Sequence, residues 1–104
     1  MYKIALVCEN AASTGLIAKK VRDAAKRLGI DAEIQHYSYT QVENFIKNVD
    51  AVLLGPQIAY RKDDIIKRFP QCANKIEVIK PMDYGMMNGE KILKDVVSLI
   101  ENKK

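Results

Sequence analysis

The chain of 104 residues contains no tryptophan, a single histidine and only two cysteines, Cys8 and Cys72. The cysteines form no CxxC pair and have no histidine cluster beside them, which argues against a disulfide scaffold and against a zinc site. No apolar run approaches the roughly 20 residues that span a bilayer. The first residues lead directly into a strand-like run without the pattern of a signal peptide. We therefore expect a cytoplasmic protein.

Sequence motifs for common ligands are also missing. Neither G-x-x-x-x-G-K-[ST] nor G-x-G-x-x-G occurs, so a nucleotide site has no support. The 17 Lys and Arg residues are interleaved with 13 Asp and Glu residues, for a net charge of +4, whereas a nucleic-acid surface would cluster its basic residues. We expect no nucleic-acid partner, no metal and no cofactor. The basic surface suits the docking of an acidic partner protein.

The composition that is present is that of an ordinary globular protein, with 48% hydrophobic and 29% charged residues. The length fits one domain over residues 1–104. Short, mostly apolar runs predict four strands, at Tyr2–Val7, Ala32–Tyr37, Ala51–Leu54 and Lys75–Ile79. Segments with apolar residues at helical spacing follow each of them, at about 13–28, 42–49, 63–69 and 88–100.

This fourfold alternation predicts an α/β fold: a single-domain three-layer α/β/α sandwich around a four-stranded parallel sheet of order 2-1-3-4. Low-molecular-weight tyrosine phosphatases share this topology. Ligand sites in such folds lie at the carboxyl ends of the strands. Three loops meet that description, namely the loop after Val7, the Gly55–Tyr60 loop and the Met82–Asn88 loop.

Four local signals refine the expected element boundaries. Gly29 is placed to end the first helix as a left-handed cap. Thr40 and Glu43 fit a capping box at the start of the second helix. Pro81 is expected to close the fourth strand before a loop, and Asn88 to cap the last helix.

Cys8 is the residue with the clearest chemical potential. It follows the apolar run that ends at Val7 and precedes a loop of small and hydroxyl residues, where backbone N–H groups and a helix N-terminus converge. Such a place favours a thiolate and binds oxyanions. The alternative is a small buried hydrophobic residue at the end of a strand. Ser13 and Thr14 fit both an anion site and a helix cap, since the same groups serve both.

The loop after Cys8 departs from that of a cysteine phosphatase. Such an enzyme needs Cys-(x)5-Arg, because the arginine binds the phosphate in a bidentate manner, and Thr14 stands at the arginine position. Hydrolysis is therefore disfavoured, and a loop that holds a phosphoryl group without hydrolysing it stays open.

Other candidates receive weaker interpretations. Cys72 is expected to be structural or incidental, and His36, inside the second strand, to lie remote from the active end of the sheet and to have no role. The methionines at positions 82, 86 and 87 are read as packing or a partner surface rather than a cofactor site.

Three segments of the sequence resemble one known family. They are Leu6-Val7-Cys8-(x)4-Ser13-Thr14, the block from Leu53 to Tyr60 with Gly-Pro-Gln at its centre, and Asp83-Tyr84-Gly85-Met86-Met87-Asn88-Gly89-Glu90-Lys91. The family is the lactose/cellobiose (chitobiose) type enzyme IIB of the bacterial sugar phosphotransferase system. With the length and the element order, the resemblance covers essentially the whole chain.

The resemblance implies a phosphocarrier in which Cys8 becomes a phosphocysteine. It would accept the phosphoryl group from a phosphohistidine of the IIA partner and pass it to a sugar bound by the membrane-embedded IIC partner. It implies a phosphate-binding loop and three residues that contact a partner or support that loop. The loop comprises Glu9, Asn10, Ala11, Ala12, Ser13, Thr14 and Gly15, and the supporting residues are Gln57, Tyr60 and Tyr84.

The resemblance further implies contact with the membrane only through IIC, and a monomer is the default for a carrier that docks two partners in turn. Lactose, cellobiose, chitobiose and related β-linked disaccharides all remain open as substrates, because specificity would belong chiefly to IIC. The alternative function is a non-catalytic regulatory or interaction module on the same fold.

The chain departs from the family in the loop itself. The usual Cys-Ser-Ala-Gly-Met-Ser-Thr reads Cys-Glu-Asn-Ala-Ala-Ser-Thr here. Ala11 replaces a glycine, which restricts positive φ, and Glu9 puts a carboxylate beside a site meant to become dianionic. We expect Glu9 to point outward, since a buried unpaired carboxylate would be costly.

Overall fold

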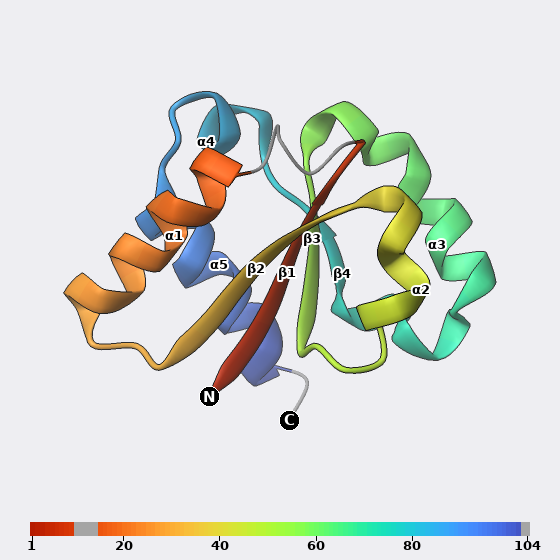
Figure 1. Ribbon diagram of the computed structural model, residues 1–104, viewed down its shortest axis with the longest axis horizontal. Helices are drawn as coiled ribbons and strands as arrows, with labels where there is room; N and C mark the ends of the chain where they lie inside the picture. Colours follow the sequence, from red (N-terminus) through yellow and green to blue (C-terminus); the bar gives the residue numbers. More distant parts are fainter. Residues whose placement is uncertain (10–14, 103–104) are drawn as a thin grey trace.

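A four-stranded parallel sheet forms the centre of the protein in a computed structural model that describes residues 1–9 and 15–102. Its order is β2-β1-β3-β4, as predicted from the sequence (Figure 1). The strands are β1 (Tyr2–Cys8), β2 (Ala32–Ser38), β3 (Ala51–Leu54) and β4 (Ile76–Val78). The two central strands are the most apolar and the most buried, because helices cover both of their faces.

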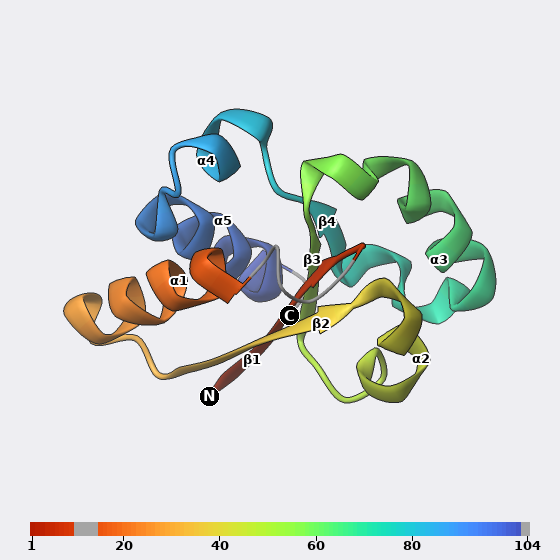
Figure 2. The ribbon, with the colours of Figure 1, turned by 45° about the horizontal axis from the view of Figure 1, so that its top comes forward.

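Helices cover the sheet on two sides. The long helices α1 (Gly15–Leu28) and α5 (Gly89–Asn102) pack together on one face, and α2 (Val42–Phe45) and α3 (Lys62–Arg68) lie on the other (Figures 1 and 2). The short helix α4 (Pro81–Gly85) and three 3-10 segments complete the elements found in residues 1–9 and 15–102. Those segments are η2 (Tyr39–Gln41), η3 (Pro56–Arg61) and η4 (Pro70–Lys75). The three-layer sandwich is confirmed.

Alternation along β1 divides the core into two clusters. Ile4 and Leu6 pack with α1 and α5, whereas Ala5 and Val7 pack with the helices on the opposite face. The same alternation holds to the last residue of β1, Cys8.

Two predicted helix caps are confirmed. Gly29 has φ +69° and follows α1, and the N–H of Ile30 reaches back to the carbonyl of Ala25 at 2.9 Å. The side chain of Asn88 accepts a hydrogen bond from the N–H of Lys91 at 3.1 Å and so caps α5.

Three predictions of local structure need correction. The capping box lies two residues earlier than expected: Ser38 accepts from the N–H of Thr40, and Gln41 accepts from the N–H of Ser38. The helix there ends at Phe45, not near Val49. The segment after Pro81 is the helix α4 rather than a loop, since proline at a first helical position has its φ already fixed and loses no needed donor. The expected helix start at residue 13 lies outside the described residues.

No helix within residues 1–9 and 15–102 is both long and apolar enough to cross a bilayer.

Candidate functional site

Cys8 is the last residue of β1, at the carboxyl edge of the sheet (Figure 1). The residue is buried, pairs with Ser38 of β2, and is one of two free cysteines. The N–H of Gly55 donates to the carbonyl of Val7 at 2.9 Å, which ties the end of β3 to the end of β1. The backbone therefore fixes the residue that carries the thiol relative to the segment that follows β3.

Gly55 is the point on which the side chains around the thiol converge. A methyl carbon in place of its hydrogen would lie 2.6 Å from Oε1 of Gln57, 3.5 Å from Sγ of Cys8 and 3.6 Å from Cε2 of Tyr84. Glycine is thus required for a close approach and not for an unusual conformation, since its φ of −61° and ψ of 149° suit any residue. The sulfur, an amide oxygen from η3 and an aromatic ring from α4 thus all approach the same point at Gly55.

Tyr84 belongs to α4, and this helix places its ring near Gly55. Its ring is partly buried against the cluster that includes Leu6, on the same side of the sheet as α1 and α5. The structure thus brings Cys8, Gln57 and Tyr84 together, as the sequence predicted for neighbouring loops. Gln57 is exposed, and Tyr60 is 67% exposed.

Glu9 turns to different partners from those of the thiol. Its Oε2 accepts a hydrogen bond from the Tyr60 hydroxyl at 2.9 Å. Its Oε1 accepts one from Nε of Arg61 at 3.1 Å and forms an ion pair with Nη2 of Arg61 at 2.9 Å. The Ser38 hydroxyl donates to the Glu9 carbonyl at 3.3 Å. With a side chain 50% exposed, Glu9 is on the surface, as expected, and it is also paired.

Arg61 is a site residue that the sequence did not single out. Its guanidinium lies over the rings of Tyr39 and Tyr60, with its carbon 4.2 Å and 5.2 Å from their centroids. Desolvation lowers the pKa of Arg61, but hydrogen bonding to Glu9 and Tyr39 and the charge of Glu9 outweigh it, so the pKa lies above its usual value. The available signal was its place directly after the Gly-Pro-Gln block.

His36 corrects a further expectation. Its ring lies 3.6 Å from the position that a Cβ on Gly15 would occupy, so it faces the start of α1 and not a remote part of the strand. The reason is again parity, since His36 shares its face with Ile34, which packs on α1. Residues 10–14, and with them the predicted roles of Asn10, Ala11, Ala12, Ser13 and Thr14, lie outside the described residues.

The remaining candidates divide between surface and core. Met82, Met86 and Met87 are exposed, which favours the partner-surface interpretation over packing. Cys72 is buried in the cluster with Val7, in keeping with a structural role.

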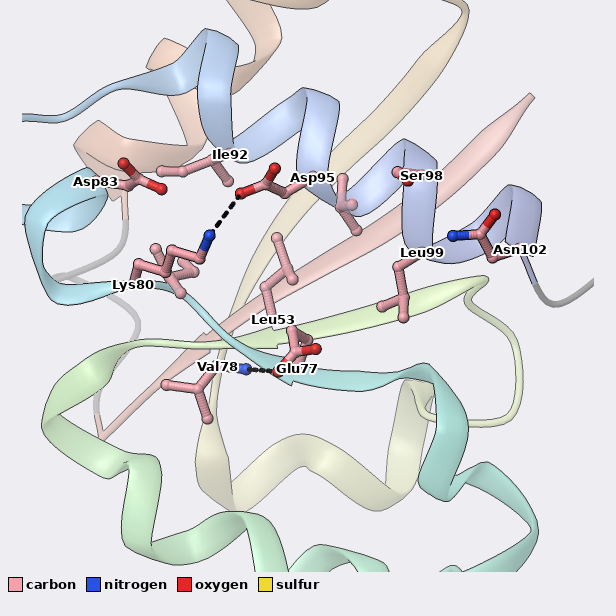
Figure 3. Close-up of a pocket in the computed structure, with 12 residues that line it drawn as sticks. Leu53, Glu77, Val78, Lys80, Asp83, Ile92, Asp95, Ser98, Leu99 and Asn102 are labelled. Carbon is pink, nitrogen blue, oxygen red and sulfur yellow. Dashed lines mark hydrogen bonds and ion pairs between the residues drawn. The ribbon is translucent and has the colours of Figure 1, made fainter.

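A cavity of about 440 Å³ lies away from the thiol, between β4 and α5. Leu53, Ile92 and Leu99 contribute apolar surface to it, and an ion pair between Lys80 and Asp95 lies at its rim (Figure 3). Within the part of the chain that the structure describes, no group of three His, Cys, Asp or Glu residues is arranged to hold a metal ion.

Chemically, the arrangement presents one sulfur nucleophile at a sheet edge, with an amide and a phenol side chain beside it and a neutralised carboxylate next in sequence. A thiolate of this kind can form a covalent bond to an electrophile such as phosphorus.

Comparisons with known proteins agree with this geometry. The family described as "PTS system, Lactose/Cellobiose specific IIB subunit" matches residues 3–95. The chain is 35% identical to the oligo-β-mannoside-specific EIIB component of Bacillus subtilis over 99% of this chain and all of that one. It is 38% identical to the galactose-specific EIIB component of Lactococcus lactis over 86% of this chain and 88% of the relative.

Solved structures include a IIB protein and a phosphatase with the same fold. The cellobiose-specific IIB protein of Borrelia burgdorferi superimposes with a TM-score of 0.83 at 32% identity, covering 99% of this chain and 94% of that one. A low-molecular-weight protein tyrosine phosphatase of Bacillus subtilis shares the fold alone, with a TM-score of 0.65 at 13% identity over 96% and 97% of the two chains. The chain therefore belongs to the lactose/cellobiose-specific IIB family of the sugar phosphotransferase system, whose members are phosphocarriers that work with IIA and IIC components.

Proposed function

We propose that Cys8 is the residue that carries the phosphoryl group in this IIB protein. The observation that supports it most directly is the convergence at Gly55: Sγ, at the end of the central strand β1, and the side chains of Gln57 and Tyr84 all approach this residue. Cys72 offers no comparable setting, because it lies in η4 before the start of β4 and so at the opposite edge of the parallel sheet from Cys8.

The proposed transfer takes place in two steps. The thiolate of Cys8 attacks the phosphorus of a phosphohistidine on IIA; the S–P bond forms, the P–N bond breaks, and the imidazole nitrogen keeps the electron pair. A sugar hydroxyl oxygen held by IIC then attacks the same phosphorus, the S–P bond breaks, and the thiolate is regenerated as the hydroxyl proton leaves. Such transfers depend on positioning and charge stabilisation more than on acid–base groups.

In this scheme Gln57, Tyr60 and Tyr84 support the reaction from η3 and α4. Gln57 and Tyr84 border the sulfur, whereas Tyr60 acts indirectly by donating a hydrogen bond to Glu9. The phosphoryl oxygens would also contact the loop at 9–15, whose Ser13 and Thr14 hydroxyls are the proposed donors. The proposed sugar is of the β-linked disaccharide or oligosaccharide class, as in the names of the oligo-β-mannoside- and cellobiose-specific relatives; another relative is named for galactose.

The test is phosphorylation of the intact chain. Incubation with phosphoenolpyruvate, the upstream phosphotransferase proteins and a cognate IIA should add the mass of one phosphoryl group, assigned to Cys8 by peptide mass. Cys8→Ser should show no added phosphoryl mass. Cys72→Ser, the matched control, should gain the same mass as the wild type. Absence of added phosphate on the wild type, with IIA still bound, would refute the proposal and favour a non-catalytic interaction module.

A further inference from the structure

The ion pair between Glu9 and Arg61 joins the residue next to the thiol to a residue 52 positions later. Because Glu9 follows Cys8 in the sequence, this pair brings a carboxylate and its counter-charge to the end of β1, where the proposed phosphoryl group forms. A phosphoryl group carries a charge of about −1.5 to −2 at pH 7, so an uncompensated carboxylate beside it would disfavour its formation through like-charge repulsion.

The thiol and the carboxylate have different surroundings. By the alternation along β1, Cys8 shares the face of Ile4 and Leu6, on the side of α1 and α5, whereas Glu9 follows the end of the strand and contacts residues at the end of η3. Their contacts agree with this: the sulfur lies near Tyr84, and the carboxylate is bound by Tyr60 and Arg61. The carboxylate is therefore directed away from the sulfur.

Arg61 is well held for this task. Nε and Nη2 of Arg61 both contact Oε1 of Glu9, at 3.1 Å and 2.9 Å, while the Tyr60 hydroxyl occupies Oε2. Its guanidinium lies over Tyr39 at 4.2 Å and over Tyr60 at 5.2 Å, and its side chain is 32% exposed. Tyr60 donates to the same carboxylate. Two aromatic rings and one carboxylate thus fix the cation beside the end of β1.

We infer that Arg61 is a positioning residue that offsets the charge of Glu9 and directs its carboxylate away from Cys8, so that an anionic group can be accommodated on the sulfur. The inference deepens the proposed function and rests on it for the identity of that group. The charges of Glu9 and Arg61 offset each other. Loss of one charge alone alters the net charge near Cys8, whereas loss of both leaves that net charge unchanged.

The test uses two alkylating reagents of different charge on the full chain. Iodoacetate is an anion and iodoacetamide is neutral, and each forms an S–C bond with loss of iodide, so the ratio of their rates at Cys8 reports the local potential. Peptide mass separates Cys8 from Cys72. We expect the ratio of iodoacetate to iodoacetamide rate to fall roughly three- to fivefold in Arg61→Gln and to return to the wild-type value in Glu9→Gln/Arg61→Gln. The deficit should shrink at high salt.

Phosphorylation of Cys8 should respond in the same direction and more strongly, with a rate lower by roughly tenfold in Arg61→Gln, because the phosphoryl group carries more charge than iodoacetate. The matched control is Arg68→Gln. Arg68 also pairs with a glutamate, Glu43, at 3.2 Å and lies over an aromatic ring, but it sits at the far end of α3, about 10 Å along the helix. Arg68→Gln should leave both the alkylation ratio and the phosphorylation rate of Cys8 unchanged.

The outcomes separate the two proposals. An unchanged alkylation ratio in Arg61→Gln, or a double variant that stays as slow as the single one, would overturn the inference and leave the role of Cys8 standing. A wild type that takes no phosphate while its alkylation ratio still depends on Arg61 would refute the proposed function and support the charge-compensating role.

Discussion

Gly55→Ala is expected to slow phosphorylation without unfolding the protein. The added methyl carbon would lie 2.6 Å from Oε1 of Gln57, where an ordinary contact needs about 3.5 Å. The amide must therefore withdraw by about 0.9 Å, whereas the contacts to Cys8 at 3.5 Å and Tyr84 at 3.6 Å are tolerated as they stand. The perturbation thus acts on one flexible side chain beside the sulfur.

The cost in stability should be small because two terms oppose each other. The backbone of Gly55 suits alanine, and such replacements stabilise by about 0.4–1 kcal/mol through the unfolded state. Forcing Gln57 off its rotamer costs about 0.5–1.5 kcal/mol. The free energy of unfolding should therefore change by less than about 1 kcal/mol, which urea denaturation would measure.

The rate should change far more, because misplacement of a positioning group by about 1 Å can cost up to about 100-fold. We expect phosphorylation of Gly55→Ala to fall by roughly ten- to a hundredfold in rapid-quench intact-mass measurements. Gln57→Ala should show the same direction of change, and Gly85→Ala is the matched control. Among the described residues, no atom beyond its chain neighbours and the backbone of its own helix lies within 4 Å of the added carbon. A folded Gly55→Ala protein with the wild-type rate would show that Gln57 does not support the transfer.

Two further changes test the fold around the site. In Gly89→Ala the added carbon would lie 2.3 Å from the backbone oxygen of Lys20. Because backbone cannot yield as a side chain can, we expect a loss of about 2 kcal/mol and a melting temperature lower by about 10 °C in calorimetry; an unchanged melting temperature would contradict the close packing of α1 on α5. The hydrogen bond to Glu101 raises the pKa of Tyr2, so its stabilisation is present below pH 10.0, the ordinary value, and is lost as pH rises through the folded value. The melting temperature of Tyr2→Phe should lie below that of the wild type at pH 8 and converge with it in alkali, and a constant difference would argue against this titration.

The fold itself does not decide between transfer and hydrolysis. A tyrosine phosphatase shares this sandwich with a TM-score of 0.65, yet Thr14 stands where Cys-(x)5-Arg requires arginine. Arg61, a cation near the end of β1, comes from η3 and is already paired with Glu9, the residue after Cys8. A phosphocarrier must keep its phosphoryl group until the acceptor arrives, and a site without a loop arginine suits that task.

The sequence by itself determined the layered fold, the strand order and the place of Cys8. Apolar periodicity and the caps at Gly29 and Asn88 are local signals, because they follow from backbone geometry and from burial of one face of each element. The Gly-Pro-Gln block and the length of the chain were enough to indicate the family.

Tertiary structure alone decided the environment of the thiol. The pairing of Glu9 with Arg61, the closeness of Tyr84 to Gly55 and the position of His36 against Gly15 all join residues far apart in the chain. Such contacts depend on strand register and on how helices lie across the sheet, which no local pattern encodes. In the sequence, Glu9 is a charge that would oppose a phosphate beside it. In the folded protein, Arg61 from another segment pairs with that charge.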